Sequence, residues 1–225
     1  MLKKEKGLLR IKNFVKSNKI IFLFLSLYFI IFLFGDYKFS YRLKEYFEND
    51  SSSINFDILT KENSIIFKNE NIRYIFKENS DTFYLVDDEN KTVTTLSFEF
   101  FDFFSSYLDK NILKNKKMNF VKDTVLTGIP VKYFSMDIDS LKRIKMFVTK
   151  ENFELSKMIK RYNNILKSYL NVDFEIIFDS IYGGIPVLFE LINGKDVDVD
   201  MQLLSFQKDN FEREFVIPQN YKINR

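Results

Sequence analysis

The sequence predicts an α+β protein, in which an N-terminal membrane or signal helix precedes one mostly antiparallel β domain that packs with two or three helices. Three observations predict this fold class. A charge-free apolar run of 15 residues follows a basic N-terminus. Short segments in which apolar and polar residues alternate begin at Ile54, and two longer segments, 98–113 and 151–170, interrupt them. With 225 residues, the chain accommodates one membrane segment and one sizeable domain.

The N-terminal run, residues 20–34, reads IIFLFLSLYFIIFLF. A bilayer span needs about 20 apolar residues, whereas a signal-peptide core has about 7–15. Residues 1–35 are therefore a signal anchor or a signal peptide, and a buried soluble helix is the third alternative. No A-x-A pattern precedes Gly35, which favours the uncleaved anchor.

Basic charge is concentrated at this end of the chain. Residues 1–19 contain one acidic residue, Glu5, and seven basic ones: Lys3, Lys4, Lys6, Arg10, Lys12, Lys16 and Lys19. The whole chain carries +3, so residues 20–225 carry +3 minus +6, or −3. A nucleic-acid partner is not expected, because such proteins concentrate basic charge on the folded domain. A basic flank instead orients a membrane segment, with residues 36–225 outside the cytoplasm.

The residue types that are absent disfavour catalysis. The chain has no Cys and no His, so it lacks disulfides, thiolate metal ligands and the usual general base near neutral pH. We expect no enzyme activity, no cofactor and no metal site. Asp137 and Asp139 are the best pair for carboxylate chemistry, but a hairpin turn explains them without catalysis.

Residues 36–53 connect the two parts and have loose helical spacing. Tyr37, Tyr41 and the apolar residues of 43–47 predict a short amphipathic helix, which Asp50 and the three serines after it would end. This juxtamembrane segment either packs on the β domain or serves as a linker. The two alternatives carry equal weight.

Strand signals fill most of residues 54–225. Segments rich in β-branched and aromatic residues recur at 54–58, 65–67, 72–76, 83–86, 93–96, 131–138, 142–148, 186–192 and 197–206. Polar turns separate them, which is typical of antiparallel sheets. Asp139-Ser140 predicts one hairpin, and Asn193-Gly194 predicts another with a type I′ turn. Asp196, Asp198 and Asp200 alternate with apolar residues, which favours a solvated strand face over a calcium site.

Two segments predict helices. Residues 98–113 are rich in Phe, and residues 151–170 carry an apolar stripe opposite Lys157, Lys160 and Arg161. Such stripes ordinarily pack on a sheet. The alternative is that the same faces line a lipid cavity, in which case we expect Phe101, Phe104, Met158 and Tyr162 to face it.

Four motifs occur in an order found in a known family. They are TFYLVDDENKTVTTL at 82–96, LTGIPVKYF at 126–134, GGIPVLFELING at 183–194 and FVIPQNYK at 215–222. In order and spacing, the chain over residues 54–225 resembles the periplasmic lipoprotein-carrier superfamily (LolA/LolB-like), and in particular its outer-membrane lipoprotein-sorting-like domains.

The resemblance implies an antiparallel half-barrel of about ten strands, with helices as a lid over an apolar concavity that holds lipoprotein acyl chains. It also implies a bacterial inner-membrane protein with its domain in the periplasm, or a periplasmic protein if the signal is cleaved. The carriers' lid-latching Arg-Pro element has no clear counterpart, because Arg73 lacks the proline. An uncleaved anchor would also prevent shuttling. The functional alternatives are a lipid- or lipoprotein-binding module and a tethered envelope scaffold with a filled core.

The topology is testable with fusion reporters. Because the basic flank orients residues 20–34, a C-terminal periplasmic reporter should be active, and replacing Lys12, Lys16 and Lys19 by Glu should impair export. A reporter that is active only in the cytoplasm would contradict the assignment.

Overall fold

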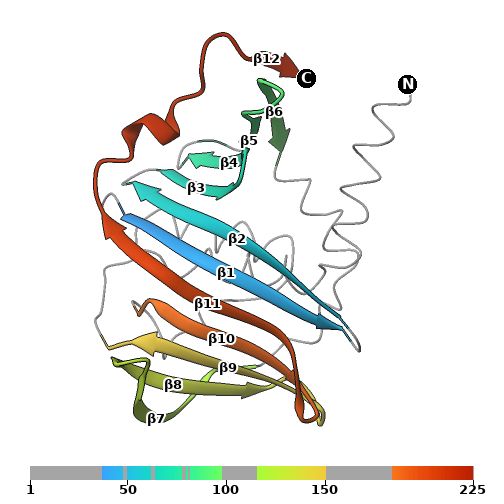
Figure 1. Cartoon of the computed structure of the whole chain (residues 1–225), viewed down its shortest axis with the longest axis vertical. Coiled ribbons are helices and arrows are strands. Elements are labelled where there is room, and N and C mark those ends of the chain that lie inside the picture. The colour runs from blue at the N-terminus through green and yellow to red at the C-terminus, as the bar shows by residue number, and fades with distance from the viewer. Residues whose placement is uncertain are drawn as a thin grey trace.

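The computed structural model describes residues 37–47, 50–61, 64–77, 80, 82–97, 116–150 and 184–224. These residues form one twelve-stranded sheet in the order β12-β6-β5-β4-β3-β2-β1-β11-β10-β9-β8-β7 (Figure 1). The strands are β1 (Tyr37–Phe47), β2 (Asp50–Lys61), β3 (Ser64–Asn69), β4 (Ile72–Lys77), β5 (Thr82–Asp87), β6 (Thr92–Ser97), β7 (Asn119–Leu126), β8 (Ile129–Asp137), β9 (Lys142–Thr149), β10 (Pro186–Asn193), β11 (Asp196–Lys208) and β12 (Lys222–Asn224). Neighbouring strands are antiparallel except for β12, which pairs with β6 in parallel.

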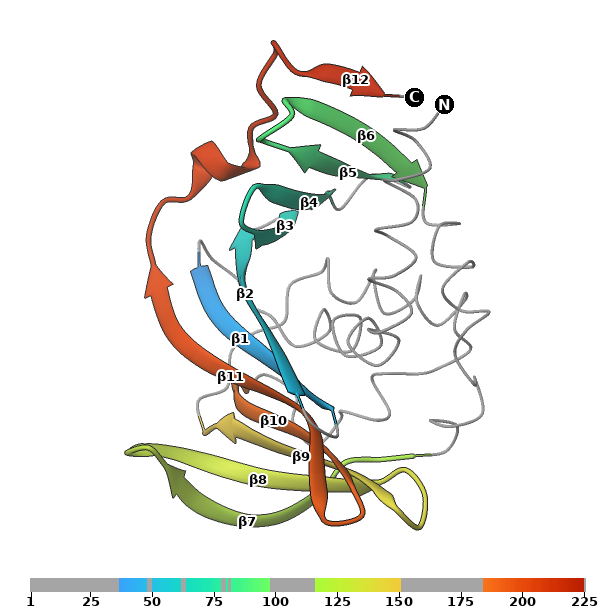
Figure 2. The ribbon, with the colours of Figure 1, turned by 45° about the vertical axis from the view of Figure 1, so that its right-hand side comes forward.

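The sheet bends strongly, so it has a concave inner face and a convex outer face (Figure 2). A short 3-10 helix, η2 (Glu212–Phe215), lies on the convex side. The chain joins the two halves of the sheet at its centre, where β1 pairs with β2 and with β11. Residues about 160 positions apart therefore become neighbours, as in the pair Arg42 and Gln202.

Strand register aligns buried apolar side chains across the inner face. One row crosses five strands and comprises Leu43, Met201, Phe189, Met146 and Phe134. Another row, in the other half, comprises the apolar Ile65, Phe76 and Phe83 and one buried polar residue, Thr60. All of these side chains are buried. Because alternate residues of a strand point to opposite faces, the same strands present different side chains outside.

The outer face is divided between polar and apolar regions. Lys38 pairs with Asp57 and Lys145 with Glu190 on its polar part. Its apolar part is a buried cluster, Leu59, Ile66, Ile75, Val86 and Val93. Residues 209–224, here called the C-terminal strap, cover this cluster with Phe211, Phe215, Ile217 and Tyr221. The strap then ends as β12 on the edge of β6.

The strands predicted from Ile54 onward are confirmed, since each coincides with one of β2–β6 or β8–β11. The described residues form twelve strands rather than about ten. Three of them, β1, β7 and β12, were not predicted as strands. Within the described residues, no helix is long and apolar enough to span a membrane. Residues 20–34, 98–113 and 151–170, for which helices were predicted, lie outside the described residues.

The helix predicted within residues 36–53 is wrong, because β1 and the start of β2 occupy this segment. Phe39, Tyr41 and Leu43 are buried and alternate with less buried polar residues, which is the two-residue period of a strand. Tyr37 and Tyr41 also fit a helical spacing, so the local pattern is ambiguous. Pairing with β2 and β11 decides the conformation. The serines expected to end the helix lie within β2.

Both predicted hairpins are present, but the turn at Asn193-Gly194 differs from the prediction. Asn193 pairs with Asp196, so Gly194 and Lys195 are the central turn residues. Gly194 has φ +63°, whereas Lys195 is not among the described residues with positive φ. A positive φ at the first central position alone is the pattern of a type II′ turn. Both central residues have positive φ at Thr127-Gly128, between β7 and β8.

This turn generates a stability prediction. A Cβ added at Gly194 would meet no atom within 4 Å, so the cost of Gly194→Val comes from backbone strain alone. We expect a loss of about 1–3 kcal/mol in the free energy of unfolding, measured by chemical denaturation. Lys195→Val is the matched control and should cost less. Equal effects at both positions would contradict the turn assignment.

Candidate binding face and the Arg73 latch

The inner face is the candidate functional surface. Its buried side chains extend over nine neighbouring strands, from β5 to β8 in the sheet order. Aromatic rings stack on it, with centroids 5.6 Å apart for Tyr41 and Phe56 and 4.8 Å apart for Phe76 and Phe83. Tyr41 is fully buried, and its hydroxyl donates a hydrogen bond to the Pro186 carbonyl at 3.2 Å. Such a surface suits an apolar ligand or an apolar covering segment.

Glu45 places a carboxyl group on this apolar face. It stands in register with Ser52 of β2 and Val199 of β11, and only 7% of the residue is exposed. The Ser52 hydroxyl donates a long hydrogen bond of 3.4 Å to Glu45 Oε2. Burial raises the pKa of the Glu45 carboxyl, and the bond from Ser52 offsets this only in part. The environment therefore disfavours the charged form.

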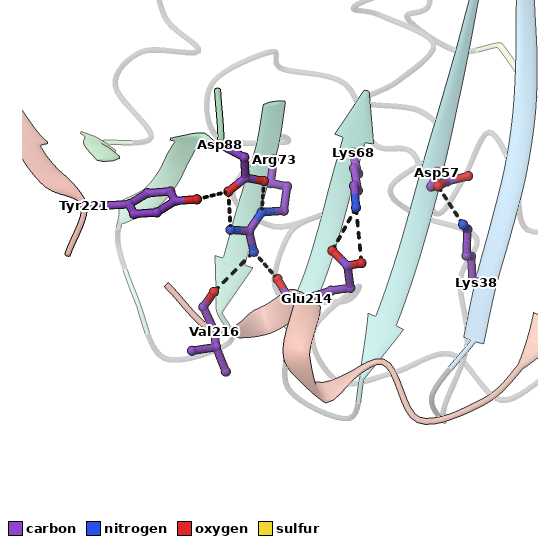
Figure 3. Close-up of polar contacts among 8 residues, drawn as sticks. All are labelled: Lys38, Asp57, Lys68, Arg73, Asp88, Glu214, Val216 and Tyr221. Carbon is purple, nitrogen blue, oxygen red and sulfur yellow. Dashed lines mark hydrogen bonds and ion pairs between the residues drawn. The ribbon is translucent and has the colours of Figure 1, made fainter. Parts of the chain in front are cut away.

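A second buried charge lies on the outer face and makes four hydrogen bonds. Arg73 of β4 donates from Nε and Nη2 to the two carboxylate oxygens of Asp88, each at 2.7 Å (Figure 3). Its Nη1 donates to the backbone carbonyls of Glu214 and Val216 in the C-terminal strap. One guanidinium thus joins β4, the turn after β5 and the strap. We call this group, Arg73 with Asp88 and its strap partners, the Arg73 latch.

Tyr221 completes the latch from the far end of the strap, because its hydroxyl donates to Asp88 Oδ1 at 3.0 Å. Burial would raise the pKa of Asp88, but hydrogen bonds from Arg73 and Tyr221 outweigh burial and hold this pKa below its ordinary value of 3.8. A carboxyl with a lowered folded-state pKa stabilises the fold above its ordinary pKa. That contribution is lost as the pH falls through the lowered value.

Further charged side chains lie across the outer face beside the latch. Lys68 of β3 is in register with both Asp57 and Arg73, and its ammonium bonds both carboxylate oxygens of Glu214, at 3.0 and 3.1 Å (Figure 3). The strap is therefore held by two cations from neighbouring strands, and its apolar residues pack on the buried cluster of the outer face. The outer face is therefore closed by the strap in this region, whereas the Glu45 carboxyl on the inner face has one long hydrogen bond, from Ser52.

The structure tests none of the lipid-binding residues predicted from sequence. Phe101, Phe104, Met158 and Tyr162 lie outside the described residues. Arg73 binds the strap on the outer face. From sequence it was not assigned the lid-latching role that an Arg has in the lipoprotein carriers. Asp196, Asp198 and Asp200 lie on β11, and the described ranges contain no group of three acidic side chains placed to hold a metal ion.

Sequence reasoning missed both buried charges. Glu45 lay in the segment predicted as a helix, and the alternation from Phe39 to Glu45 could have placed it on the buried face. Nothing local could have revealed the partners of Arg73, since the strap carbonyls are 141 and 143 residues away in sequence.

The Arg73 latch makes a testable contribution to stability. Arg73→Met leaves Asp88 and two strap carbonyls without their donor, so we expect a loss of about 1.5–3 kcal/mol in urea unfolding at neutral pH. The loss should shrink as the pH falls from 3.8 through the lowered pKa of Asp88, because the folded-state carboxylate becomes protonated over that range. Arg143→Met removes an exposed ion pair with Asp137 and should cost less than about 1 kcal/mol. Similar losses in the two variants would contradict the role of the latch.

Comparison with known proteins gives a fold likeness only. No family model matches the sequence, and no curated protein matches it. Among solved structures, an uncharacterized conserved protein from Thermus thermophilus matches at 7% identity and a TM-score of 0.49, over 85% of this chain and 90% of that one.

Two further solved structures resemble the chain. A LolA superfamily protein from Nitrosomonas europaea matches at 8% identity and a TM-score of 0.36, over 85% of this chain and 94% of that one. A protein domain assigned to outer membrane lipoprotein sorting, from Vibrio parahaemolyticus, matches at 9% identity and a TM-score of 0.31, over 80% and 89%. At such identities no residue role transfers between the chains.

Proposed function

We propose that this chain is a non-catalytic cell-envelope protein whose inner face binds the acyl chains of a lipid or a lipoprotein. The observation that carries the proposal is the alignment of buried apolar side chains across nine neighbouring strands of one bent sheet. These side chains are buried without any ligand, so an acyl chain would have to take the place of apolar cover that they already have. Each buried CH₂ contributes about 0.8 kcal/mol, so a single chain is a substantial ligand.

Residues outside the described ranges complete the proposal. Phe101, Phe104, Met158 and Tyr162 face the same ligand in this account, from the predicted helices at 98–113 and 151–170. Residues 20–34 hold the protein at the bacterial inner membrane, with the sheet in the periplasm, or direct its export if they are cleaved. A tethered protein that binds acyl chains would receive or retain cargo rather than shuttle it, and sorting of outer-membrane lipoproteins is the process that the four sequence motifs suggest.

The second candidate is a tethered scaffold that binds another protein and has a filled core. The edge strand β7 favours it, because Phe120, Val121 and Val125 are about half exposed or more. Among the described strands, β7 has a hydrogen-bonded neighbour on one side only, so its other side can pair with a strand of a partner. Acyl-chain binding and strand pairing use different parts of the sheet, and one measurement separates them.

That measurement is acyl-probe binding by a fragment of residues 36–225. The wild-type fragment should bind a fluorescent fatty acid, and Phe101→Asp or Phe104→Asp should weaken binding at least about tenfold, since a charge facing an apolar ligand costs more than about 1.4 kcal/mol. Leu141→Asp is the control, because Leu141 is 64% exposed at the β8–β9 turn. A wild-type fragment that is folded and binds no probe would leave the scaffold as the surviving candidate.

A further inference from the structure

Two charged side chains are buried among the described residues, and they differ in how well they are paired. Arg73 on the outer face makes two bonds to Asp88 and two to strap carbonyls. Glu45 on the inner face accepts one bond, from Ser52 at 3.4 Å, and within the described ranges its second carboxylate oxygen has no partner. Buried polar groups are ordinarily hydrogen-bonded, so Glu45 is the exception that calls for an explanation.

The position of Glu45 connects it to the apolar surface. Its row across the sheet continues through Val199, Leu191, Ile144 and Met136, all apolar and buried. The adjacent row on the same face begins at Leu43. Glu45 lies near the end of β1, where β1 leads into β2. A molecule lying along the inner face would therefore meet apolar side chains over most of its length and one carboxyl group at the β1–β2 end.

We propose that Glu45 is the polar anchor of the inner face and binds the primary ammonium group of an amphiphile whose apolar chain lies over β1, β11 and β10. This inference rests on the proposed function and adds the head-group chemistry of the ligand. An ammonium carries three donors and a positive charge, so it satisfies both carboxylate oxygens. The same chemistry is presented by the head of an amino lipid and by a lysine side chain of an acylated polypeptide.

The alternative role for Glu45 is structural, and stability distinguishes the two. A carboxyl kept for the fold would lower the melting temperature when it is removed, as is expected for Arg73. A carboxyl kept for a ligand is a burden on the empty fold, because its burial is poorly compensated. Ligand-free Glu45→Leu should therefore melt at the same temperature as the wild type or higher.

The binding test uses the full chain in lipid nanodiscs, titrated calorimetrically with octylammonium, octanol and octanoate. Nanodiscs that carry each variant correct for partitioning of the probes. The wild type should bind octylammonium at least tenfold more tightly than octanoate, and Glu45→Gln should reduce this preference at least fivefold while leaving octanol binding unchanged. Glu190→Gln is the matched control, since Glu190 lies on the outer face next to Lys145 and should change nothing.

The outcomes separate the two claims. Equal binding of the three probes by the wild type, or an unchanged preference in Glu45→Gln, would overturn the anchor and leave the acyl-chain proposal standing. Binding of none of the probes would overturn both. If the anchor holds, titration with a lysophosphatidylethanolamine and with an acylated lysine peptide identifies which source of the ammonium group binds more tightly. A marked fall in the melting temperature of Glu45→Leu would also overturn the anchor in favour of a structural role.

Discussion

This structure depends on one constraint: each apolar region on the two faces of the twelve-stranded sheet must be kept from water. The constraint arises because side chains alternate between the two faces along every strand. Register makes the inner face apolar over nine neighbouring strands, as the row from Leu43 to Phe134 illustrates. The outer face has a buried apolar cluster, which contains Ile66 and Ile75. The remaining features of the fold follow from how these two regions are covered.

The outer cluster is covered by the chain itself. The C-terminal strap supplies the aromatic cover, but none of the residues of η2 is fully buried, so apolar contact alone holds it weakly. The Arg73 latch adds charge-assisted bonds at low exposure, which are stronger than those between neutral groups. The fold tolerates the buried charge of Arg73 because the Asp88 carboxylate and two strap carbonyls accept its hydrogen bonds. Glu45, on the inner face, is poorly hydrogen-bonded by comparison. Because of this contrast we assign a structural role to Arg73 and a ligand-binding role to Glu45.

Much of the sheet could be predicted from the sequence, because period-two alternation with polar turns is a local signal. The segments from Ile54 to Leu96 and the two later hairpins carry it clearly. β1 was misassigned because Tyr37 and Tyr41 fit a helix as well as a strand, and only pairing with β11, about 160 residues away, resolves the ambiguity. The same distance in sequence hides the latch, since Arg73 gives no local indication that its acceptors are carbonyls of Glu214 and Val216. The turn at Gly194 was predicted at the correct place. Its turn type was not, because the type depends on which two residues form the last pair of the β10–β11 hairpin.

The central claim is that the inner face holds an apolar ligand, and the most direct test is to identify what the native protein carries. The full chain, purified from its own membrane without exchange into added lipid, is analysed by native mass spectrometry and then by lipid mass spectrometry after solvent extraction. The account predicts a stoichiometric acyl-bearing species that is released on unfolding and is depleted in Phe101→Asp or Phe104→Asp. A protein whose intact mass equals that of the bare chain, and whose extract contains only the lipids of the bulk membrane, would contradict it.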